Sequence, residues 1–581
     1  MRLLLYLFYP ILILVILGYF FIINKQTKFT LRTHFKFLFL STLSFFVLGN
    51  IILFVYFKNE QFIYYWDYAT FWEQSLRINK LISENSRDAF LYVIDSMNYQ
   101  EYTALPALFI SLPTSILGQS FFAFILSSFN FFVIPFYIFL SIFELELISK
   151  LNLKFISNWL LFVCNFLFIP FYFTLFHGYI GVVGQIFIVS LFLIYITKNH
   201  KLDLPEVLII NSLTLLLIFT RRWYLFWVVS YYLSSGLFIL LDIRKSKMET
   251  IRSISKLVMS GVLMLIIILV FFYPYFSALF VSNFSDLYAS YKLPSLVAEF
   301  LRFKSYYGLF IILLFIYGLY SSISKSSTIL WFVLIVTTLT AMQFLYIQSF
   351  EYHHYNLISF GIFVFVLITI LELNHLKSVK FLVLTLYIFN SIYVFIPKLN
   401  LLNTFFSSTS LKPKFRDDIV EIQDLSNYLN MLTSENKYAY SAASSPILND
   451  DLLRNSQLPW IMNSVPNLEG SSNNDIRDGF PISFFEVNYV LVTNPVQINA
   501  SYIDKQFINQ LINNSVLYQL EIRNNYQLVY ENRISGVDVY IFERVSEFNT
   551  NEKRYFYNEL SKMYPESPHV YDKIIEEETS K

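Results

Sequence analysis

The sequence is poor in charge, in glycine and in cysteine. Charged residues make up 14% of the 581 residues, and there are 14 glycines and a single cysteine, Cys164. Soluble domains carry about 25% charged residues, so a chain this low in charge is not an ordinary soluble protein. Cys164 has no intrachain partner, and disulfides therefore say nothing about the compartment. The formal net charge of +1 gives no support to nucleic-acid binding, and we expect no nucleic-acid partner.

The sequence also lacks the common nucleotide and metal motifs. It contains no P-loop, no G-x-S-x-G elbow and no array of Cys and His at metal-ligand spacing. Gly178, Gly181 and Gly184 lie between two apolar runs with no preceding strand, so they do not form a nucleotide loop. Cytosolic nucleotide chemistry is therefore not expected, and we predict neither a cofactor nor a metal ion.

Apolar length dominates the first 396 positions. The chain is 56% hydrophobic and 20% aromatic, and its apolar runs of about 20 residues can each cross a hydrocarbon core ~30 Å thick. No small-residue cleavage site follows the first run, which predicts a retained helix rather than a signal peptide. The sequence thus predicts an α-helical polytopic membrane protein with about twelve transmembrane helices. The expected spans are 3–23, 37–57, 121–144, 155–176, 181–197, 206–220, 223–241, 257–280, 305–321, 327–347, 357–372 and 381–396.

Lysine and arginine in the short loops predict the orientation, because positive residues there stay cytoplasmic. They recur in every second loop, at 25–36, 150–154, 198–201, 244–256, 325 and 377–380. The segments expected on the outer side are 58–120, 177–180, 221–222, 281–304 and 348–356, together with both termini. The short apolar run 102–117 contains two prolines, and counting it as a span would invert every later loop. We therefore expect an interfacial segment there.

The composition changes after Pro397. Short β-rich runs at 489–493, 526–530 and 537–542 are separated by turn signals, and helical patterns cover 415–433 and 503–520. The predicted domains are a transmembrane core, 1–400, with a large outer loop, 58–120; a soluble α/β domain, 401–550; and a charged tail, 551–581. By the loop charges, the α/β domain is extracytoplasmic. The tail is expected as a peripheral helix or a loose end.

One carboxylate lies inside a crowd of aromatic rings after the second predicted span. The stretch "QFIYYWDYATFWEQ" at 61–74 contains Asp67 between Trp66 and Tyr68. Aromatic walls raise the proton affinity of a carboxylate, which a general base near neutral pH requires, and the rings can stack on sugars or isoprenoid chains. The alternative is an interfacial turn that carries a solvated acid. Asp67 is the candidate catalytic residue.

Two arginines interrupt a long apolar stretch. Arg221 and Arg222, in "TRRWYLFW", fall at the junction of two predicted helices on the expected outer side, against the positive-inside bias. A pair of guanidiniums can grip a phosphate in a bidentate manner, whereas the alternative is anchoring to lipid headgroups. Lys292 is a second candidate for the same phosphate.

Further polar residues gather at the same expected membrane face. Such groups are costly beside a bilayer unless they line an aqueous or ligand-filled cavity, so they form the candidate donor and acceptor pocket. In "QSFEYHHYN", the acid and the two histidines could ligate a divalent metal, but adjacent histidines diverge on regular structure, so hydrogen bonding to phosphate or sugar is preferred. The pocket candidates are Trp66, Tyr68, Glu73, Glu101, His177, Glu351, His353, His354 and Asn356. For His177, the alternative is an ordinary histidine at a helix end.

The chain resembles the GT-C class of membrane glycosyltransferases, especially the protein O-mannosyltransferase and aminoarabinose-transferase branch. The segment "PALFISLPTSILGQSFFAF" at 106–124 is similar to the proline-started interfacial helix of those enzymes, and "RRWYLFW" and "EYHHYN" look like outer-side motifs of bacterial members. The resemblance implies transfer of a sugar from a polyprenyl-phosphate carrier to an acceptor at the outer face, with inversion. Asp67 would be the general base. Arg221, Arg222 and Lys292 would hold the donor phosphate, and His353, His354 and Asn356 would complete the pocket.

Two departures from the family pattern concern the catalytic loop. The family often shows Asp-Glu or Asp-x-Asp there, whereas Tyr68 follows Asp67 and the next acid is Glu73, which favours a metal-free mechanism. One extra span also precedes the loop.

The prediction is an enzyme of the cell membrane that acts on a cell-surface glycan or polymer. The alternatives are a lipid-linked glycan transporter or flippase, a polysaccharide polymerase or ligase that uses polyprenyl diphosphates, and a non-catalytic scaffold. Transporters tend to show internal repeats, and this sequence has none.

Overall fold

A computed structural model of the chain describes residues 16, 18–20, 25–153, 158–198, 202–241, 246–281, 288, 291–325, 327–373, 377–396, 402–457, 465–499 and 506–575. The chain forms two compact units. The helical unit comprises residues 1–59 and 67–413, and the C-terminal unit comprises residues 60–66 and 414–581. The unit boundary thus falls later than the expected one at 400, and the C-terminal unit includes a short piece of the expected outer loop 58–120.

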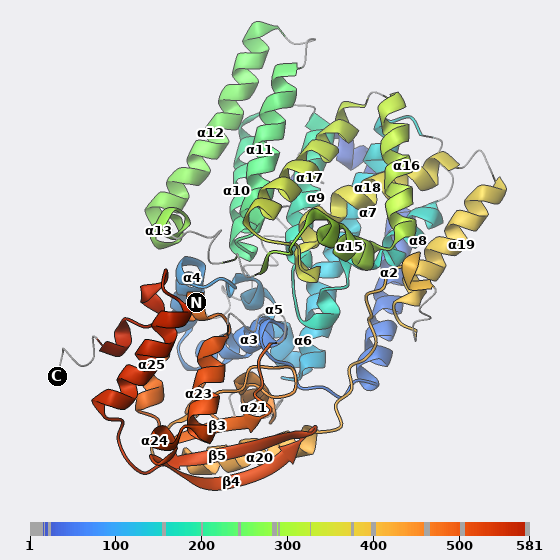
Figure 1. The fold of residues 1–581 in the computed structure, drawn as a ribbon. Helices are drawn as coiled ribbons and strands as arrows, with labels where there is room; N and C mark the ends of the chain where they lie inside the picture. Colours follow the sequence, from blue (N-terminus) through green and yellow to red (C-terminus); the bar gives the residue numbers. More distant parts are fainter. Residues whose placement is uncertain are drawn as a thin grey trace. The chain divides into compact units, whose positions relative to one another are not determined.

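The helical unit contains the long apolar helices of a membrane protein (Figure 1). Among the described residues, five helices are long and apolar enough to cross a bilayer, or six if one bent pair counts as a span. They are α2 (Lys25–Lys58), the continuous α6, η2 and α7 (Phe121–Lys150), α11 (Tyr224–Leu241), α12 (Lys247–Phe271) and α17 (Thr328–Ile347), and the bent pair is α15 (Leu296–Tyr307) with α16 (Leu309–Lys325).

The other apolar helices have 10 to 17 residues. In chain order they are α5 (Leu105–Leu117), α8 (Asn158–Leu167), α9 (Val182–Lys198), α10 (Leu204–Thr220), α18 (Asn356–Glu372) and α19 (Lys377–Tyr393), and α13 (Tyr273–Val281) follows α12. Each predicted span from 37–57 onward overlaps an apolar helix, but three of them are interrupted. Among the described residues, 155–176 is α-helical only over 158–167, 257–280 is broken between α12 and α13, and 305–321 crosses the bend of 99° between α15 and α16. The span 3–23 lies largely outside the described residues. The number twelve therefore stays a prediction.

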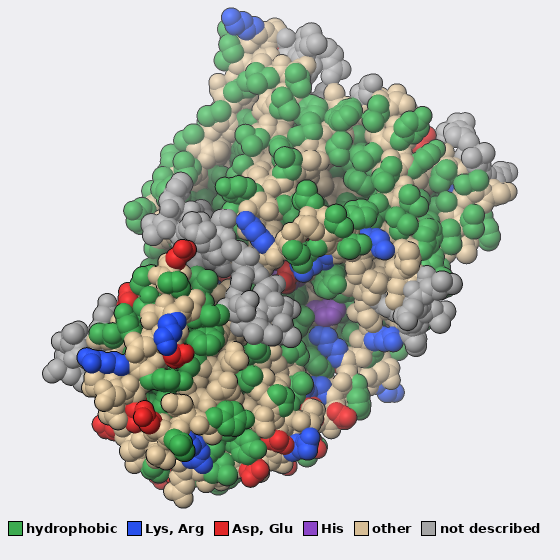
Figure 2. Space-filling model, in the orientation of Figure 1, with side chains coloured by type: hydrophobic (Ala, Val, Ile, Leu, Met, Phe, Trp, Pro, Cys, Tyr) green, Lys and Arg blue, Asp and Glu red, His purple; other side chains and the backbone are tan. Residues whose placement is uncertain are grey.

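Helices of the helical unit expose apolar side chains where a soluble protein would not. Phe35, Phe39, Phe46 and Phe54 of α2 are 44 to 66% exposed, and Figure 2 shows hydrophobic side chains over most of the visible surface of this unit. Contiguous apolar surface of this kind marks contact with lipid or with a partner. The central helix α18 is buried along nearly its whole length, as expected for a helix that is apolar all round.

The expected outer loop, 58–120, contains three helices, α3 (Asp67–Glu84), α4 (Ser86–Tyr99) and α5 (Figure 1). Pro106 lies in the first turn of α5, where its missing N–H costs no hydrogen bond. At about 1.5 Å per residue, α5 is about 20 Å long, too short for a hydrocarbon core of ~30 Å. Gly118, at φ 114°, ends α5, and Ser120 Oγ accepts the N–H of Ala123 to start α6. The run 102–117 thus forms the short proline-started helix and following turn that the resemblance implies.

The C-terminal unit is built on a five-stranded mixed sheet. The strand order is β2 (Leu468–Glu469), β1 (Ala439–Ser441), β3 (Tyr489–Asn494), β5 (Val537–Arg544) and β4 (Tyr526–Ile534). The strand β1 pairs in parallel with β2 and β3, whereas β5 runs antiparallel to β3 and β4. Ser535 and Gly536 both have positive φ, as a two-residue turn of type I′ requires. The three predicted strands are confirmed, and so are the predicted helices, as α20 (Ile419–Leu432) and α23 (Phe507–Tyr518).

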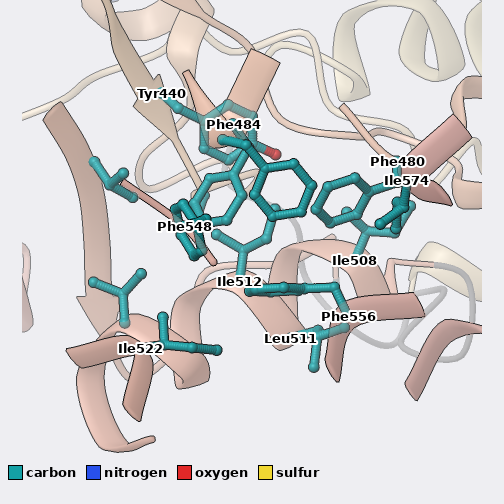
Figure 3. Packing of buried hydrophobic residues seen from close by; sticks show 14 of the residues in the cluster. Tyr440, Phe480, Phe484, Ile508, Leu511, Ile512, Ile522, Phe548, Phe556 and Ile574 are labelled. Atoms are coloured by element: carbon teal, nitrogen blue, oxygen red, sulfur yellow. The ribbon is translucent and has the colours of Figure 1, made fainter. Parts of the chain in front are cut away.

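Two apolar clusters make the core of this unit, and Figure 3 shows one of them, in which the rings of Phe484, Phe548 and Phe556 meet. Phe556 and Leu560 come from α25 (Thr550–Met563) and are fully buried in this cluster. The expected separation of a charged tail, 551–581, is therefore wrong for α25. Its apolar residues recur every four positions and give the helix one core-facing side. The remaining helices are α21 (Asp450–Asn455), α22 (Asp475–Asp478) and α24 (Leu520–Arg523).

Residues 60–66 belong to the C-terminal unit although they precede it by about 350 positions. Gln61 forms a parallel bridge with Phe415, and Ile63 and Tyr65 are buried in the second apolar cluster. The alternation of buried residues at 63 and 65 is that of a strand-like segment. The chain therefore leaves the helical unit after Asn59 and returns to it at Asp67.

Candidate active site

Asp67 is the first residue of α3 and accepts two tyrosine hydroxyls. Tyr102 Oη donates to Asp67 Oδ2 at 2.7 Å, and Tyr179 Oη donates to the same oxygen at 3.4 Å. The positive end of the α3 dipole also favours a negative charge at this position. All three groups belong to the helical unit. Hydrogen bonds to the charged form favour a carboxylate that is ionised and fixed in direction.

Arg221 reaches the same tyrosines from the junction of α10 and α11. It ends α10 with extended backbone and is 6% exposed. Its Nη2 donates to Tyr102 Oη at 3.3 Å, and its guanidinium lies 5.2 Å from the Tyr102 ring centroid and 5.8 Å from that of Tyr179. Burial lowers the pKa of Arg221, but the nearby Tyr102, Tyr179 and Asp67 outweigh it, and the net pKa is raised. Arg221 therefore stays charged.

Tyr102 thus joins a carboxylate to a guanidinium through one hydroxyl group. It donates to Asp67 and accepts from Arg221. The Nε of Arg221 is buried and has no hydrogen-bond partner among the described residues. Since a buried guanidinium rarely leaves donors unused, Arg221 has capacity left for an anionic ligand.

Arg222 points to other elements. Its Nη2 donates to the carbonyl of Asn98 in α4 at 3.2 Å, and its guanidinium lies 5.2 Å from the ring centroid of Tyr275 in α13. Burial lowers its pKa, and its Nε also has no partner within the described part of the chain. The two arginines therefore do not converge on one group, contrary to a paired grip on a single phosphate. The Glu101 carboxylate favours the charged form of both guanidiniums, although burial still leaves the pKa of Arg222 lowered.

The segment before α18 brings two histidines to the same site. The ring of His353, in the short helix η6 (Tyr352–His354), stacks on Tyr179 with a centroid distance of 4.6 Å and an interplanar angle of 15°. His354 Nδ1 accepts the backbone N–H of Glu351 at 3.2 Å. Burial lowers the pKa of both imidazoles well below the usual range, so they are neutral at pH 7. Burial likewise raises the pKa of the Glu351 carboxyl.

A narrow cavity connects Arg221 with the histidines. Its volume is about 10 Å³, room for roughly one water, so it can seat a single small group but not a whole sugar. Asn356 Nδ2 donates to Thr174 Oγ1 at 3.0 Å, whereas its buried Oδ1 has no partner among the described residues. The cavity is lined by Gly181, Arg221, Trp223, Tyr224, His353, His354, Asn356 and Leu357.

The loop before α9 packs on the start of α3. Gly178 has φ +83°, and a Cβ there would lie 2.1 Å from the carbonyl oxygen of Tyr68, so only glycine fits. The Tyr68 ring lies 5.6 Å from that of Tyr179 and 5.8 Å from that of His177. His177 Nδ1 pairs with the carbonyl of Phe173 at 3.1 Å. Tyr68 and His177 therefore lie beside Tyr179, and their role as pocket residues stays a prediction.

Three other predicted pocket or phosphate residues, Glu73, Lys292 and Trp66, are not among the contacts described above. The Glu73 carboxylate lies close enough to Tyr92 of α4 to favour its protonated hydroxyl, and the guanidinium of Arg77 lies over the same Tyr92 ring. Lys292 is exposed, and its neighbour Leu293 donates its N–H to Ser349 Oγ at 2.6 Å, close in sequence to the histidines. Trp66 belongs to the C-terminal unit.

Sequence reasoning missed Tyr102 and Tyr179, the two residues that bond Asp67. They are 35 and 112 positions away from it, and tyrosine is so common in this chain, with 43 copies, that neither stands out. The only local signal is their position, directly before α5 and directly after the glycine of "FHGYIG".

An apolar cavity of about 420 Å³ lies among the helices of the same unit. An apolar cavity of about 150 Å³ already holds benzene, so this one can take a longer hydrocarbon. Leu175 and Phe176 line the cavity, and Tyr179, in the same loop, bonds Asp67. One short loop therefore contacts both the apolar cavity and the carboxylate. The remaining lining residues are Phe45, Gly49, Ile52, Leu53, Phe129, Phe166, Leu167, Ile169, Tyr172, Ser391, Ile392 and Phe395.

Within the described residues, no group of three or more His, Cys, Asp and Glu side chains is arranged to hold a metal ion. Neither the models of known protein families nor the sequences of curated proteins match this chain.

Proposed function

We propose that this protein is a membrane glycosyltransferase that moves a sugar from a polyprenyl-phosphate donor to a cell-surface glycan or polymer, with Asp67 as the general base. The observation that carries the proposal is the partly buried chain of hydrogen bonds from Arg221 through Tyr102 to Asp67. In this chain, the hydroxyl of Tyr102 connects the proposed base, Asp67, with the proposed anion-binding group, Arg221. A transfer from a phosphate-linked sugar requires both groups at the reacting carbon.

In the proposed reaction, an acceptor hydroxyl attacks the anomeric carbon of the donor sugar. Asp67 takes the hydroxyl proton as the new carbon–oxygen bond forms, and the bond to the phosphate oxygen breaks on the opposite face, which inverts the carbon. The phosphate leaves with the bonding electrons and gains negative charge. Arg221, charged and held by two tyrosine rings, stabilises that charge without having to reorganise. The Tyr102 and Tyr179 hydroxyls fix the direction of the carboxylate.

The apolar cavity supports a donor with a hydrocarbon tail. Twelve of its fourteen lining residues are apolar, and the hydroxyls of the other two are already bonded: that of Ser391 to the carbonyls of Leu167 and Tyr387, and that of Tyr172 to the carbonyl of Asn165. A ligand of the cavity therefore needs no polar group there. The loop shared with Tyr179 supports one ligand that spans both places, with its tail in the cavity and its phosphate near Arg221.

The outer-face location rests on the loop charges. Basic residues concentrate in the loops that are expected to be cytoplasmic. Asp67, Tyr102, Tyr179, Arg221 and His353 come from the segments that alternate with those loops, which are expected on the outer side or at its edge. The resemblance to the GT-C class points to the same reaction and the same membrane face.

The test compares turnover in matched variants. Purified wild type, Asp67→Asn and the control Asp95→Asn, whose carboxylate is exposed on α4, are reconstituted in lipid and supplied with a polyprenyl-phosphate hexose and acceptor glycans. Release of polyprenyl phosphate is followed. Loss of a general base lowers the rate by about 10²–10⁴-fold, so Asp67→Asn should release almost none, while Asp95→Asn should match wild type.

Full turnover by Asp67→Asn would remove Asp67 as the base. If wild type released no lipid phosphate from any lipid-linked sugar but moved the lipid between the leaflets of proteoliposomes, the transporter alternative would replace the enzyme.

A further inference from the structure

The residue before Asp67 adopts an unusual backbone conformation. Trp66 has φ +50°, in the left-handed region that bulky residues rarely enter. Such conformations persist only where the surrounding structure imposes them, and they gather at functional sites. The peptide bond after Trp66 leads directly into Asp67 and α3. The conformation of Trp66 therefore sets the direction in which the chain enters the helix that presents the carboxylate.

One carboxylate holds this conformation. Asp451 Oδ2 accepts the backbone N–H of Trp66 at 2.9 Å. Asp451 lies on α21, and the same helix supplies Asn455, whose Nδ2 donates to the carbonyl of Tyr64 at 3.0 Å. A rigid helical turn thus binds the last residues before Asp67 at two points.

The rest of the segment is anchored in the same unit. The N–H of Gln61 donates to the carbonyl of Lys414 at 2.9 Å, and the carbonyl of Gln61 accepts the N–H of Arg416 at 2.8 Å. Ile63 and Tyr65, each 6% exposed, pack in the apolar cluster that contains Leu452 and Leu453 of α21. Alternate residues from 61 to 65 are therefore held by the C-terminal unit. The bond from Asp451 to the Trp66 N–H is the last of these contacts before Asp67.

We propose that Asp451 is a positioning residue for the Asp67 carboxylate. It does not touch the reacting atoms, but it holds the Trp66 N–H and so fixes the start of α3. This inference rests on the proposed function, in which Asp67 must lie within hydrogen-bond reach of the acceptor hydroxyl. A base that is misplaced by about 1 Å can lose up to a hundredfold in rate. The C-terminal unit thereby contributes to catalysis through one partly buried hydrogen bond between a carboxylate and a backbone N–H.

The adjacent residue provides a matched control. Asp450 and Asp451 are neighbours on α21, and both pair with Arg454 Nη1, at 2.8 and 3.3 Å. The Trp66 N–H bonds only to Asp451 among these acids. The variant Asp450→Asn therefore perturbs the same ion pair without removing the bond to Trp66. The variant Asp451→Asn keeps an amide oxygen that can accept the N–H, whereas Asp451→Ala removes the acceptor.

The experiment measures backbone hydrogen exchange and kinetics on the full-length protein in lipid. In Asp451→Ala, peptides covering 64–70 should exchange about tenfold or more faster than in wild type, because the Trp66 N–H has lost its acceptor. The kcat should fall about ten- to a hundredfold while the KM for the polyprenyl-phosphate hexose changes less than about twofold. Asp451→Asn should restore both values, and Asp450→Asn should leave both near wild type.

Two results would overturn the proposal: unchanged exchange at 64–70 in Asp451→Ala, or faster exchange with an unchanged kcat. If Asp451→Ala does not fold, Asn455→Ala, which removes only the bond to the Tyr64 carbonyl, should show the same changes at smaller size, and no change in it would count against the proposal. A wild type without any turnover would contradict the proposed function. The exchange data would then still decide whether Asp451 anchors the segment.

Discussion

Two buried polar clusters, one in each unit, differ in how completely their groups are bonded. In the C-terminal unit, Gln506 is 1% exposed, and its Nε2 donates to Ser444 Oγ at 3.1 Å and to the carbonyls of Ser472 and Asn473 at 3.2 Å. Its Oε1 accepts the N–H of Asn499 at 2.6 Å. Gln506 thus has bonds on both ends of its amide.

The cluster around Asp67 in the helical unit is different. Two of its buried polar atoms, Arg221 Nε and Asn356 Oδ1, have no partner among the described residues. Leaving such a group unpaired costs about 1–3 kcal/mol, and more for a charged one, so proteins keep it mainly where a ligand completes it.

The two clusters also differ in where they lie, and position alone would favour the Gln506 cluster as a binding site. The Gln506 cluster lies beyond the carboxyl ends of the parallel strands β1 and β3, which is the usual ligand position in α/β sheets. Yet its own side chains bond one another, which is the pattern of a structural network. The Asp67 cluster has no such conventional position and retains unused donors. Between these two clusters, the unused hydrogen-bonding groups of Arg221 and Asn356 favour the Asp67 cluster as the site candidate, and the following variants test that difference.

The largest effect is expected at Arg221. Arg221→Ala removes the charged donor next to the leaving phosphate and should lower kcat/KM by about 10²–10³-fold. Arg221→Lys should recover only part of it, because an ammonium cannot reproduce the planar fork. Initial rates of polyprenyl-phosphate release measure both, with Arg87→Ala, exposed on α4, as the control. An Arg221→Ala protein with wild-type kcat/KM would place the anion site elsewhere.

The opposite behaviour is expected at Gln506. Gln506→Ala leaves several buried partners unsatisfied and should lower the free energy of unfolding of the C-terminal unit by about 2–3 kcal/mol. Hydrogen exchange of β3 reports this change. Turnover per folded molecule should stay within about twofold of wild type. A selective loss of donor or acceptor affinity would instead make the Gln506 cluster a binding site.

A pH effect of about 2 kcal/mol is expected from Asp475 in the same network. Burial raises the pKa of its carboxyl to about 6, although Tyr564, Ser472 and the N–H of Ile508 donate to it. Because the folded pKa exceeds the unfolded one, near 3.8, this group stabilises the fold below about pH 4 and loses that contribution as the pH rises through about 6.

The measurement for Asp475 is the stability of the C-terminal unit of wild type and Asp475→Asn between pH 4 and pH 7. Wild type should lose about 2 kcal/mol more than the variant over this range. Parallel curves would mean that Asp475 does not titrate there.

The smallest effects separate the two tyrosines. Tyr102→Phe removes a hydrogen bond of 2.7 Å and also the link to Arg221, so about a tenfold loss of kcat is expected, whereas Tyr179→Phe removes a bond of 3.4 Å and should cost about twofold. Both variants keep the rings that stack on Arg221 and His353. The reverse order of effects would make Tyr179 the main support of Asp67.

The sequence allowed good predictions where a pattern is local. The strands β3, β4 and β5 have six to nine residues each and are rich in β-branched and aromatic residues, and the sequence predicted all three. The strands β1 and β2 have three and two residues, too few for a period, so they and the strand order could not be predicted. The helical tract 155–176 ends at Leu167 because Pro170 follows.

For the candidate site, residue type and expected membrane face led to Asp67 and Arg221. The structure supplies what connects them, and that connection depends on Tyr102 and Tyr179, which come from distant segments. The sequence also could not predict that residues 60–66 belong to the C-terminal unit, because the bridge of Gln61 with Phe415 joins positions more than 350 apart.

That bridge also has a consequence for biosynthesis. The ribosome makes residues 60–66 long before residues 414–581, so this piece waits without its partners while the helices from α3 to α19 are synthesised. Closing so long a loop is slow, and Ile63 and Tyr65 find their apolar neighbours only after release of nearly the whole chain. Newly made molecules are thus expected to mature late. A fragment that begins at 414 would expose the hollow that these two side chains normally fill.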